Sequence, residues 1–308
     1  MNNNIKNTPP PILEILGFIF FLVPASENIF IALVSLLNWK KNKSLSLTER
    51  IIFWLCVLSI LDDLRQTYSF VHYYLHGAFG NPYRQFTTIL FLTLSSSKLW
   101  LSAWLCLHYC LKIVQIHHRF YHHLQLRFPR VLPWLLTSSL LGSFLLSFFV
   151  ESRSTKHHFS LSDKNTTLSD QSHHEKIIRY SAYGVYTGLG LLVSLLSTFL
   201  IVVHLCHHIK NIDIQAGNGG GPRVRPHVHV VKIVSSLFIL NAFLFFFINS
   251  FILNRSISMR IYIFQIVASF LNAVTSFNLI KGNSKLDKRL EELTACCLVG
   301  KCCPDKPF

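Results

Sequence analysis

The 308-residue chain is 51% hydrophobic and 14% charged, with a mean hydropathy of +0.40, whereas an average soluble protein carries about 25% charged residues. This composition excludes a soluble globular protein and leaves room for one membrane domain. The formal net charge is +15, but the Lys and Arg residues are scattered among the loops and form no basic stripe interleaved with aromatics, so we predict no nucleic-acid binding.

Seven apolar stretches follow one another along the chain. Each is long enough to cross about 30 Å of hydrocarbon, which takes about 20 residues. The fold class that we predict is an all-α seven-transmembrane helix bundle, in which residues 1–11 form a short N-terminus, residues 12–286 the bundle and residues 287–308 a tail. The predicted spans are residues 12–38, 50–75, 86–115, 131–150, 178–206, 230–253 and 261–281.

The distribution of basic residues predicts the orientation. With the N-terminus outside, eighteen Lys and Arg fall on the cytoplasmic side and nine on the outer side, which is the asymmetry typical of membrane proteins. Two N-glycosylation sequons, at Asn165 and Asn254, then lie outside. We therefore predict an extracellular N-terminus, a cytoplasmic C-terminus and glycosylation at both asparagines.

Charged residues interrupt the second span. Asp62, Asp63 and Arg65 lie within it, and an acidic residue within a membrane is usually paired or faces a cavity. Asp62 and Arg65 are three residues apart on one helix and can neutralise each other, as a packing lock or as part of a switch linked to Asn28 through water. We place Arg65 and Lys98 near the outer ends of their spans.

Cysteines and histidines give no metal site. The 16 histidines are not joined by acidic ligands on one buried face, and we predict no metal and no cofactor. The tail cysteines form two pairs, Cys296-Cys297 and Cys302-Cys303, which lack the spacing of a zinc module. For Cys296 and Cys297, juxtamembrane palmitoylation and unmodified thiols are the alternatives. Four further cysteines fall within spans, where we expect small core residues: Cys56, Cys106, Cys110 and Cys206.

Other functional classes lack their signatures. A channel or transporter would need polar residues repeated along a pore, and none recur. An intramembrane enzyme would need paired catalytic groups, but Asp62 and Asp63 are adjacent on a helix and point about 100° apart. We predict that the protein is not an enzyme and has no catalytic residue.

The third span carries a family resemblance. It reads Trp-Leu-Ser-Ala-Trp-Leu-Cys-Leu-His-Tyr-Cys-Leu-Lys-Ile from Trp100 to Ile113. This run resembles the type 2 bitter taste receptors, in which it is close to Trp-x-Ala-Thr-x-Leu-Ser-x-Phe-Tyr-x-Leu-Lys-Ile. Further landmarks agree in register along the chain: Asn28, Leu45-Ser46, Glu49, Ser194-Leu195, His208, His227-Val228, Lys232, Ser276, Asn283 and Lys285-Leu286.

The chain departs from the family pattern at four positions. Ser59 replaces the usual Arg of the second span, Gly190 the Pro of the fifth, Asn241 an aromatic of the sixth and Thr275 the His of the seventh. We therefore expect a divergent member. The nearest alternative is a vomeronasal type 1-like chemosensory receptor, but the Lys-Ile end of the third span favours the bitter receptors.

The resemblance implies a G protein-coupled receptor in the plasma membrane that binds small bitter-type compounds in an outward-facing pocket and activates a gustducin-like heterotrimeric G protein. Trp100 is placed near the outer third of its span, one turn above Trp104, with a lipid-facing belt position as the alternative. Gln265 is a ligand contact or a packing amide. The implied ligand-binding residues are Trp100, Trp104, Asn241 and Gln265. The implied coupling and activation residues are Asn28, Tyr109, Lys112, His208, Lys232, Ser276 and Lys285.

Overall fold

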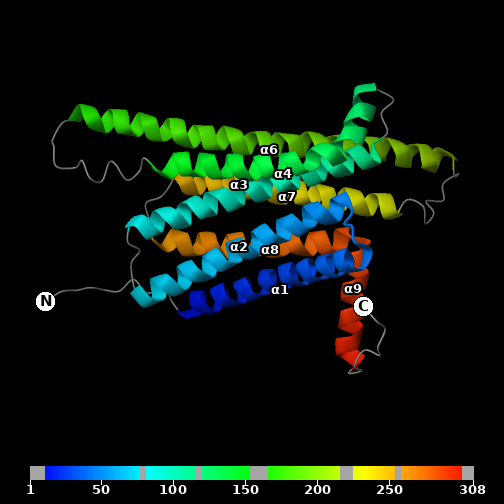
Figure 1. The fold of residues 1–308 in the computed structure, drawn as a ribbon, viewed down its shortest axis with the longest axis horizontal. Coiled ribbons are helices and arrows are strands. Elements are labelled where there is room, and N and C mark those ends of the chain that lie inside the picture. Colours follow the sequence, from blue (N-terminus) through cyan, green and yellow to red (C-terminus); the bar gives the residue numbers. More distant parts are fainter. Residues whose placement is uncertain are drawn as a thin grey trace.

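The computed structural model describes residues 11–76, 81–114, 119–152, 166–215, 225–253 and 258–299. These ranges contain eight helices and no strand (Figure 1). The helices are α1 (Pro11–Asn42), α2 (Leu47–His76), α3 (Asn81–Ile113), α4 (Arg119–Ser152), α6 (Thr166–Gln215), α7 (Arg225–Leu253), α8 (Ser258–Gly282) and α9 (Ser284–Val299).

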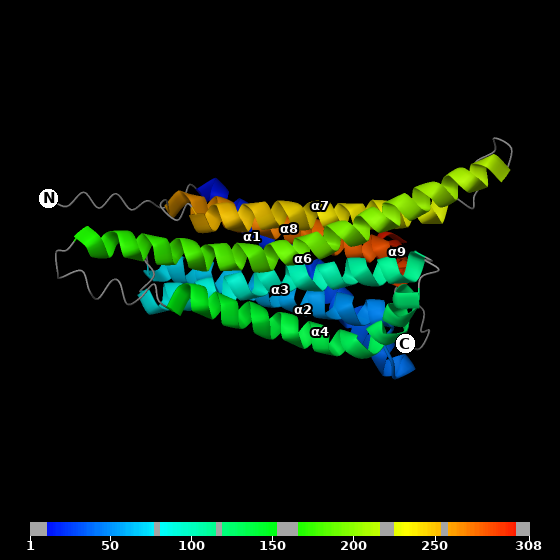
Figure 2. The same cartoon turned by 90° about the horizontal axis from the view of Figure 1, so that it is seen from above.

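The long helices form one bundle. They lie side by side in both views, whereas α9 runs crosswise at one end (Figures 1 and 2). Helix α3 is central, because it packs against α2, α4, α6 and α7, while α8 packs against α1, α2 and α7. The all-α seven-helix bundle predicted from the sequence is thus confirmed.

The helices extend beyond most of the predicted spans. The largest differences occur at α4, which begins at Arg119 instead of residue 131, and at α6, which covers Thr166–Gln215 instead of residues 178–206. Hydropathy marks only the apolar part of a helix, whereas its backbone hydrogen bonds continue into polar turns. Helix α9 has no counterpart among the predicted spans, since it is short and polar.

Five helices hold stretches long and apolar enough to cross a membrane: α1, α3, α4, α6 and α7. Helix α2 carries Asp62, Asp63 and Arg65 at its centre, which lowers its hydropathy. The described side chains of α8 give the shorter apolar segment Ile266–Gly282.

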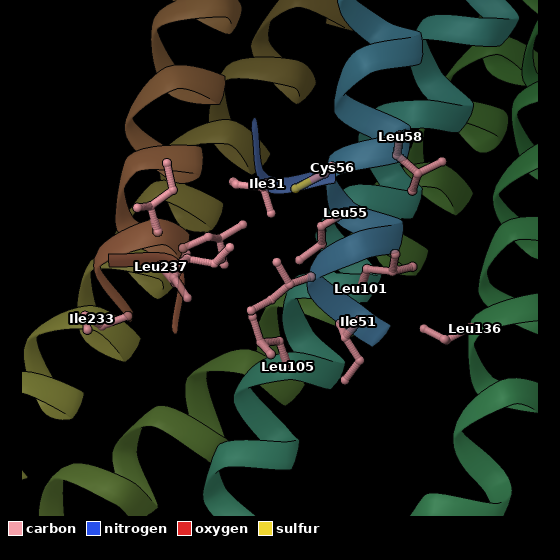
Figure 3. Packing of buried hydrophobic residues seen from close by; sticks show 14 of the residues in the cluster. Ile31, Ile51, Leu55, Cys56, Leu58, Leu101, Leu105, Leu136, Ile233 and Leu237 are labelled. Atoms are coloured by element: carbon pink, nitrogen blue, oxygen red, sulfur yellow. The ribbon is translucent and has the colours of Figure 1, made fainter. Parts of the chain in front are cut away.

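A hydrophobic core joins the helices in the part of the bundle that reaches α9. Figure 3 shows Ile31 of α1, Leu55 of α2, Leu105 of α3 and Leu237 of α7 converging, and the same cluster includes Leu286 of α9. Large apolar side chains also cover the outside of the bundle, including Phe199 and Phe246. Helices that are apolar all round are typical of a membrane bundle.

The cysteine predictions hold only in part. Cys56, Cys106 and Cys110 are buried, but Cys206 is exposed, so its assignment to the core is wrong. Its neighbour Leu205 is the residue of that turn that packs inward, and adjacent helical residues point about 100° apart.

Candidate functional site

A charged centre lies at mid-height of the bundle, between α2, α3 and α8. Lys98 Nζ donates to Asp62 Oδ2 at 2.7 Å and to Asn272 Oδ1 at 3.0 Å. Arg65 Nε donates to Asp62 Oδ1 at 2.9 Å. Asp62 therefore joins two cations, and Lys98 connects three helices.

The charged centre is buried. Asp62 is 1% exposed and Lys98 8% exposed, and the Arg65 guanidinium lies 5.0 Å from the centre of the Phe91 ring. Removing one partner of a buried ion pair leaves an uncompensated charge, which typically costs about 3–5 kcal/mol. The relative positions of α2, α3 and α8 thus depend on one shared carboxylate.

A polar stripe on α8 continues the network. Ser269, Asn272 and Ser276 are spaced by three and four residues, so they share one helix face. Each contacts another helix, which ties α8 to α1 and α2 as well as to α3. The bonds are Ser269 Oγ to Gln66 Oε1 at 2.7 Å, Asn272 Nδ2 to Asp63 Oδ1 at 3.5 Å and Ser276 Oγ to Asn28 Oδ1 at 2.8 Å.

The structure confirms the Asp62–Arg65 pair and corrects the place of Lys98. Lys98 is 17 positions after Asn81 and 15 positions before Ile113, so it lies at the middle of α3 and not near its outer end. A lysine inside an apolar span was itself the signal of a functional or paired group. The water link from Asp62 to Asn28 stays a prediction.

Two tryptophans of α3 face α4 and α6. The ring centres of Trp100 and Trp104 are 5.3 Å apart, and those of Trp100 and Tyr186 are 5.4 Å apart. Trp104 Nε1 donates to Ser139 Oγ at 2.9 Å, and Tyr186 Oη donates to the Ser139 carbonyl at 3.1 Å. The Trp100 Nε1 atom is buried and has no hydrogen-bond partner among the described residues.

Gly190 allows α6 to approach this aromatic group closely. A Cβ atom at position 190 would lie 2.6 Å from Leu99 Cδ2 and 3.4 Å from Trp100. Side-chain contacts of 2.6 Å are not tolerated without a shift, because protein interiors are close-packed. Because Leu99 Cδ2 is the end of a flexible side chain, a larger residue at position 190 would require the Leu99 side chain to move.

Asn241 lies on the other flank of α3. Its Nδ2 donates to Ser102 Oγ at 2.6 Å in a buried α3–α7 contact. Ser102 is two residues from both tryptophans, which places it about 200° around the helix from them. The structure thus brings Trp100 and Trp104 together but separates them from Asn241.

Trp100 is also deeper than the sequence predicts. Trp100 is 19 positions after Asn81 and 13 positions before Ile113, so the prediction that it lies in the outer third of its helix is wrong. Trp100 is also at the middle of the predicted span of residues 86–115, and the five residues by which α3 begins earlier only add to its depth. The side chain of Gln265 lies outside the described residues.

At the α9 end, Glu49 joins the start of α2 to α9. Its Oε2 accepts from Ser46 N at 2.9 Å and Ser46 Oγ at 2.8 Å, and its Oε1 accepts from Lys285 Nζ at 2.9 Å. Burial raises the pKa of Glu49, but the hydrogen bonds from Lys285 and Ser46 outweigh it, and the pKa is below its ordinary value. The implied coupling residue Lys285 thus also holds the first turn of α2.

Three more of the implied coupling residues occur near the same end, whereas Asn28 and Ser276 bond each other in the α8 stripe. Lys112 and Lys232 are exposed at the ends of α3 and α7, and Tyr109 packs against the apolar clusters. The side chains of His208, Cys296 and Cys297 lie outside the described residues, as do Asn165 and Asn254.

Comparison with known proteins identifies the family. The family described as taste receptor protein (TAS2R) matches residues 10–297. Taste receptor type 2 member 8 of Pongo pygmaeus is 25% identical, over 90% of this chain and 93% of the relative. Member 9 of Homo sapiens is 28% identical over 84% and 85%, and member 3 of Pongo pygmaeus is 30% identical over 87% and 88%.

The family match covers every helix of the bundle, and α9 almost to its end. It therefore includes the charged centre, both flanks of α3 and the Glu49–Lys285 contact. The chain belongs to the type 2 taste receptor family, and it is a multi-pass membrane protein of the plasma membrane.

Proposed function

We propose that this receptor binds small bitter-type compounds from outside the cell and activates a gustducin-like heterotrimeric G protein inside. The N-terminus is extracellular and the C-terminus cytoplasmic, as the distribution of basic residues favours. The vomeronasal alternative is not favoured, because the relatives found are type 2 taste receptors. The proposed glycosylation sites are Asn165 and Asn254. The proposed palmitoylation sites are Cys296 and Cys297, with unmodified thiols as the alternative.

The unpartnered indole of Trp100 carries the ligand-site proposal. A buried donor without a partner costs about 1–3 kcal/mol, and a ligand acceptor that reaches Nε1 recovers that cost. The neighbouring rings of Trp104 and Tyr186 offer apolar area and stacking to a flat ligand. The ligand chemistry that fits is an aromatic or polycyclic compound bearing a carbonyl or ether oxygen.

Trp100→Ala tests this site. We expect its agonist concentration for half-maximal response to rise at least tenfold, since losing a buried aromatic anchor typically costs about 2 kcal/mol. Trp100→Phe keeps an aromatic ring but removes the N–H donor, so it should raise this agonist concentration by an intermediate factor. The measurement is a calcium response in cells with a promiscuous Gα subunit, at matched surface expression.

Trp134→Ala is the matched control, because this α4 tryptophan is 77% exposed and should leave potency unchanged. Asn241→Ala examines the other flank of α3. A potency shift for Asn241→Ala with none for Trp100→Ala, across several unrelated agonists, would place the ligand between α3 and α7 and return Trp100 to a packing role.

On the cytoplasmic side, Lys112 near the inner end of α3 and Lys232 in the inner part of α7 are exposed cations. The ligand favours a conformer in which the inner ends of α3, α6 and α7 separate and admit the G protein. The hydrogen bond from Asn241 to Ser102, which joins α7 to α3, is an interhelical contact that such a movement would change.

A further inference from the structure

The first turns of α4 lie crosswise to the bundle, at the same end as α9 (Figure 1). Pro129 and Pro133 lie inside α4. Proline lacks the N–H that closes the helical hydrogen bond and bends the helix, so the change of direction has a local cause. We call residues 119–130 the α4 arm.

One face of the α4 arm anchors it to α3. Tyr121 Oη donates to the Cys110 carbonyl at 2.8 Å. Phe128 is 3% exposed, and its ring stacks on His108 with centres 5.9 Å apart. Together with Leu124, which also packs on the core, these residues follow the three-and-four spacing of a helix face.

The opposite face is basic and uncompensated. Arg119, Arg127 and Arg130 are exposed, and none has an ion pair with a described residue. The sequence holds no Asp or Glu from Arg119 to Val150. Leu126 is 65% exposed beside these cations, and Trp134, one turn beyond Arg130, is 77% exposed.

Helix α9 lies at the same end and provides a contrast. Its cations and acids balance along its length, and they pair: Arg289 bonds Glu292 at 3.2 Å, Lys285 bonds Glu49 at 2.9 Å, and Asp287 bonds Lys281 at 2.6 Å. A basic surface without carboxylates is therefore a property of the α4 arm and not of every surface helix at this end.

We propose that the α4 arm binds the headgroups of anionic phospholipids in the adjacent membrane leaflet, which is the cytoplasmic leaflet in the orientation proposed above. Exposed arginines next to exposed Leu126 and Trp134 match a surface of phosphates above hydrocarbon. Arginine holds phosphate oxygens with paired N–H donors. The arm is at the rim of the bundle, since α4 packs mainly on α3 and α6, so it faces lipid rather than the interior between α3, α6 and α7.

The test uses the purified full-length receptor in vesicles of phosphatidylcholine with a minor share of phosphatidylserine. Mass spectrometry of the lipid that stays bound after mild extraction gives the enrichment of phosphatidylserine. We expect enrichment for the wild type that falls with added salt. Arg127→Gln with Arg130→Gln should lower it on the order of fivefold per charge, and Arg127→Lys with Arg130→Lys should keep most of it.

Lys288→Gln with Arg289→Gln is the matched control, because it removes two cations from α9, and enrichment should be unchanged. Equal losses in the two glutamine doubles, or no enrichment in the wild type, would overturn the proposal. A second measurement tests whether the α4 arm binds the G protein instead of lipid. It follows nucleotide exchange on the G protein in vesicles of phosphatidylcholine alone. A lower exchange rate for the Arg127→Gln, Arg130→Gln receptor would assign the arm to the G protein. Phosphatidylserine is present in both leaflets of these vesicles, so the result does not depend on the orientation.

Discussion

At the scale of single residues, Asp62 is the shared partner that holds the charged centre together. Two cations from different helices bond its two oxygens, so each cation is satisfied only while the carboxylate is present. In a low-dielectric interior these shared ion pairs fix the helices relative to one another while all three groups are present. Loss of one group destabilises the bundle, because it leaves a buried charge unpaired.

A double-mutant cycle tests this sharing. Asp62→Ala leaves Lys98 and Arg65 buried without their acid, and we expect it to lower the free energy of unfolding by about 3–5 kcal/mol. Asp62→Ala combined with Lys98→Ala should recover part of that loss, because the two effects are coupled. Thermal unfolding of the purified receptor measures the stability, and ligand-independent signalling measures the effect on the activation equilibrium.

The same cycle with Arg65→Ala in place of Lys98→Ala distinguishes the contributions of the two cations to stability. Recovery in both doubles would confirm that the carboxylate is shared, and purely additive losses would show that Asp62 is held by other groups. Arg289→Ala breaks the exposed pair with Glu292 and serves as the control, since such pairs contribute only about 0.2–1 kcal/mol.

At the scale of the helices, the contact between α3 and α6 depends on Gly190. We expect Gly190→Ala to lower the free energy of unfolding by about 1–3 kcal/mol, the usual cost of overpacking, because the new methyl group would overlap Leu99. Gly188→Ala is the matched control on the same helix, since its Cβ would meet the Phe245 ring at an ordinary 3.8 Å.

Thermal unfolding of both variants and of the double Gly190→Ala, Leu99→Ala gives the measurement. The double should regain part of the stability relative to the sum of the two single losses, because Leu99 no longer occupies the space. Equal behaviour of the two glycine variants would mean that α6 is free to move away from α3 at no cost.

The contact between Glu49 of α2 and Lys285 of α9 makes a pH-dependent contribution to the stability of the folded protein. The pKa of Glu49 is lowered in the folded protein, so the stabilisation is present above the ordinary carboxyl pKa and is lost as the pH falls through the lowered value. We expect wild-type thermal stability to fall more steeply than that of Glu49→Gln across this acidic range. Parallel pH profiles would show that Glu49 makes no net contribution.

At the scale of the whole molecule, apolar contacts and polar contacts are concentrated in different parts of the bundle. The main apolar core reaches Leu286 at the α9 end, whereas ion pairs and amide hydrogen bonds join α2, α3 and α8 at mid-height. Apolar contacts have no preferred direction, whereas hydrogen bonds weaken steeply when their distance or angle changes. We therefore expect changes of conformation to be felt first at the charged centre.

The orientation of the whole molecule gives a separate prediction. If the segment between α4 and α6 is outside, glycosidase treatment should shift the wild-type band on a gel, and Asn165→Gln should remove most of that shift. Asn254→Gln should have the smaller effect, because its sequon is close to the bilayer. A receptor that reaches the cell surface without any glycan at Asn165 would contradict this use of the sequon.

The sequence by itself determined the number of spans, their order and the Asp62–Arg65 pair. These follow from local rules, because a span must be about 20 apolar residues long and an i, i+3 pair on one helix meets whatever the tertiary structure is. The family landmarks are local in the same sense, since they depend on residue type at fixed spacing.

Only the tertiary structure decided which faces of the helices meet. Lys98 is bonded to Asp62 and Asn272, which are 36 and 174 residues away in sequence, and no local pattern reveals such partners. The same holds for the separation of Asn241 from the tryptophans and for the close approach at Gly190. Hydropathy is nearly uniform around a membrane helix, so rotation and depth are set by packing against neighbouring helices rather than by the apolar pattern.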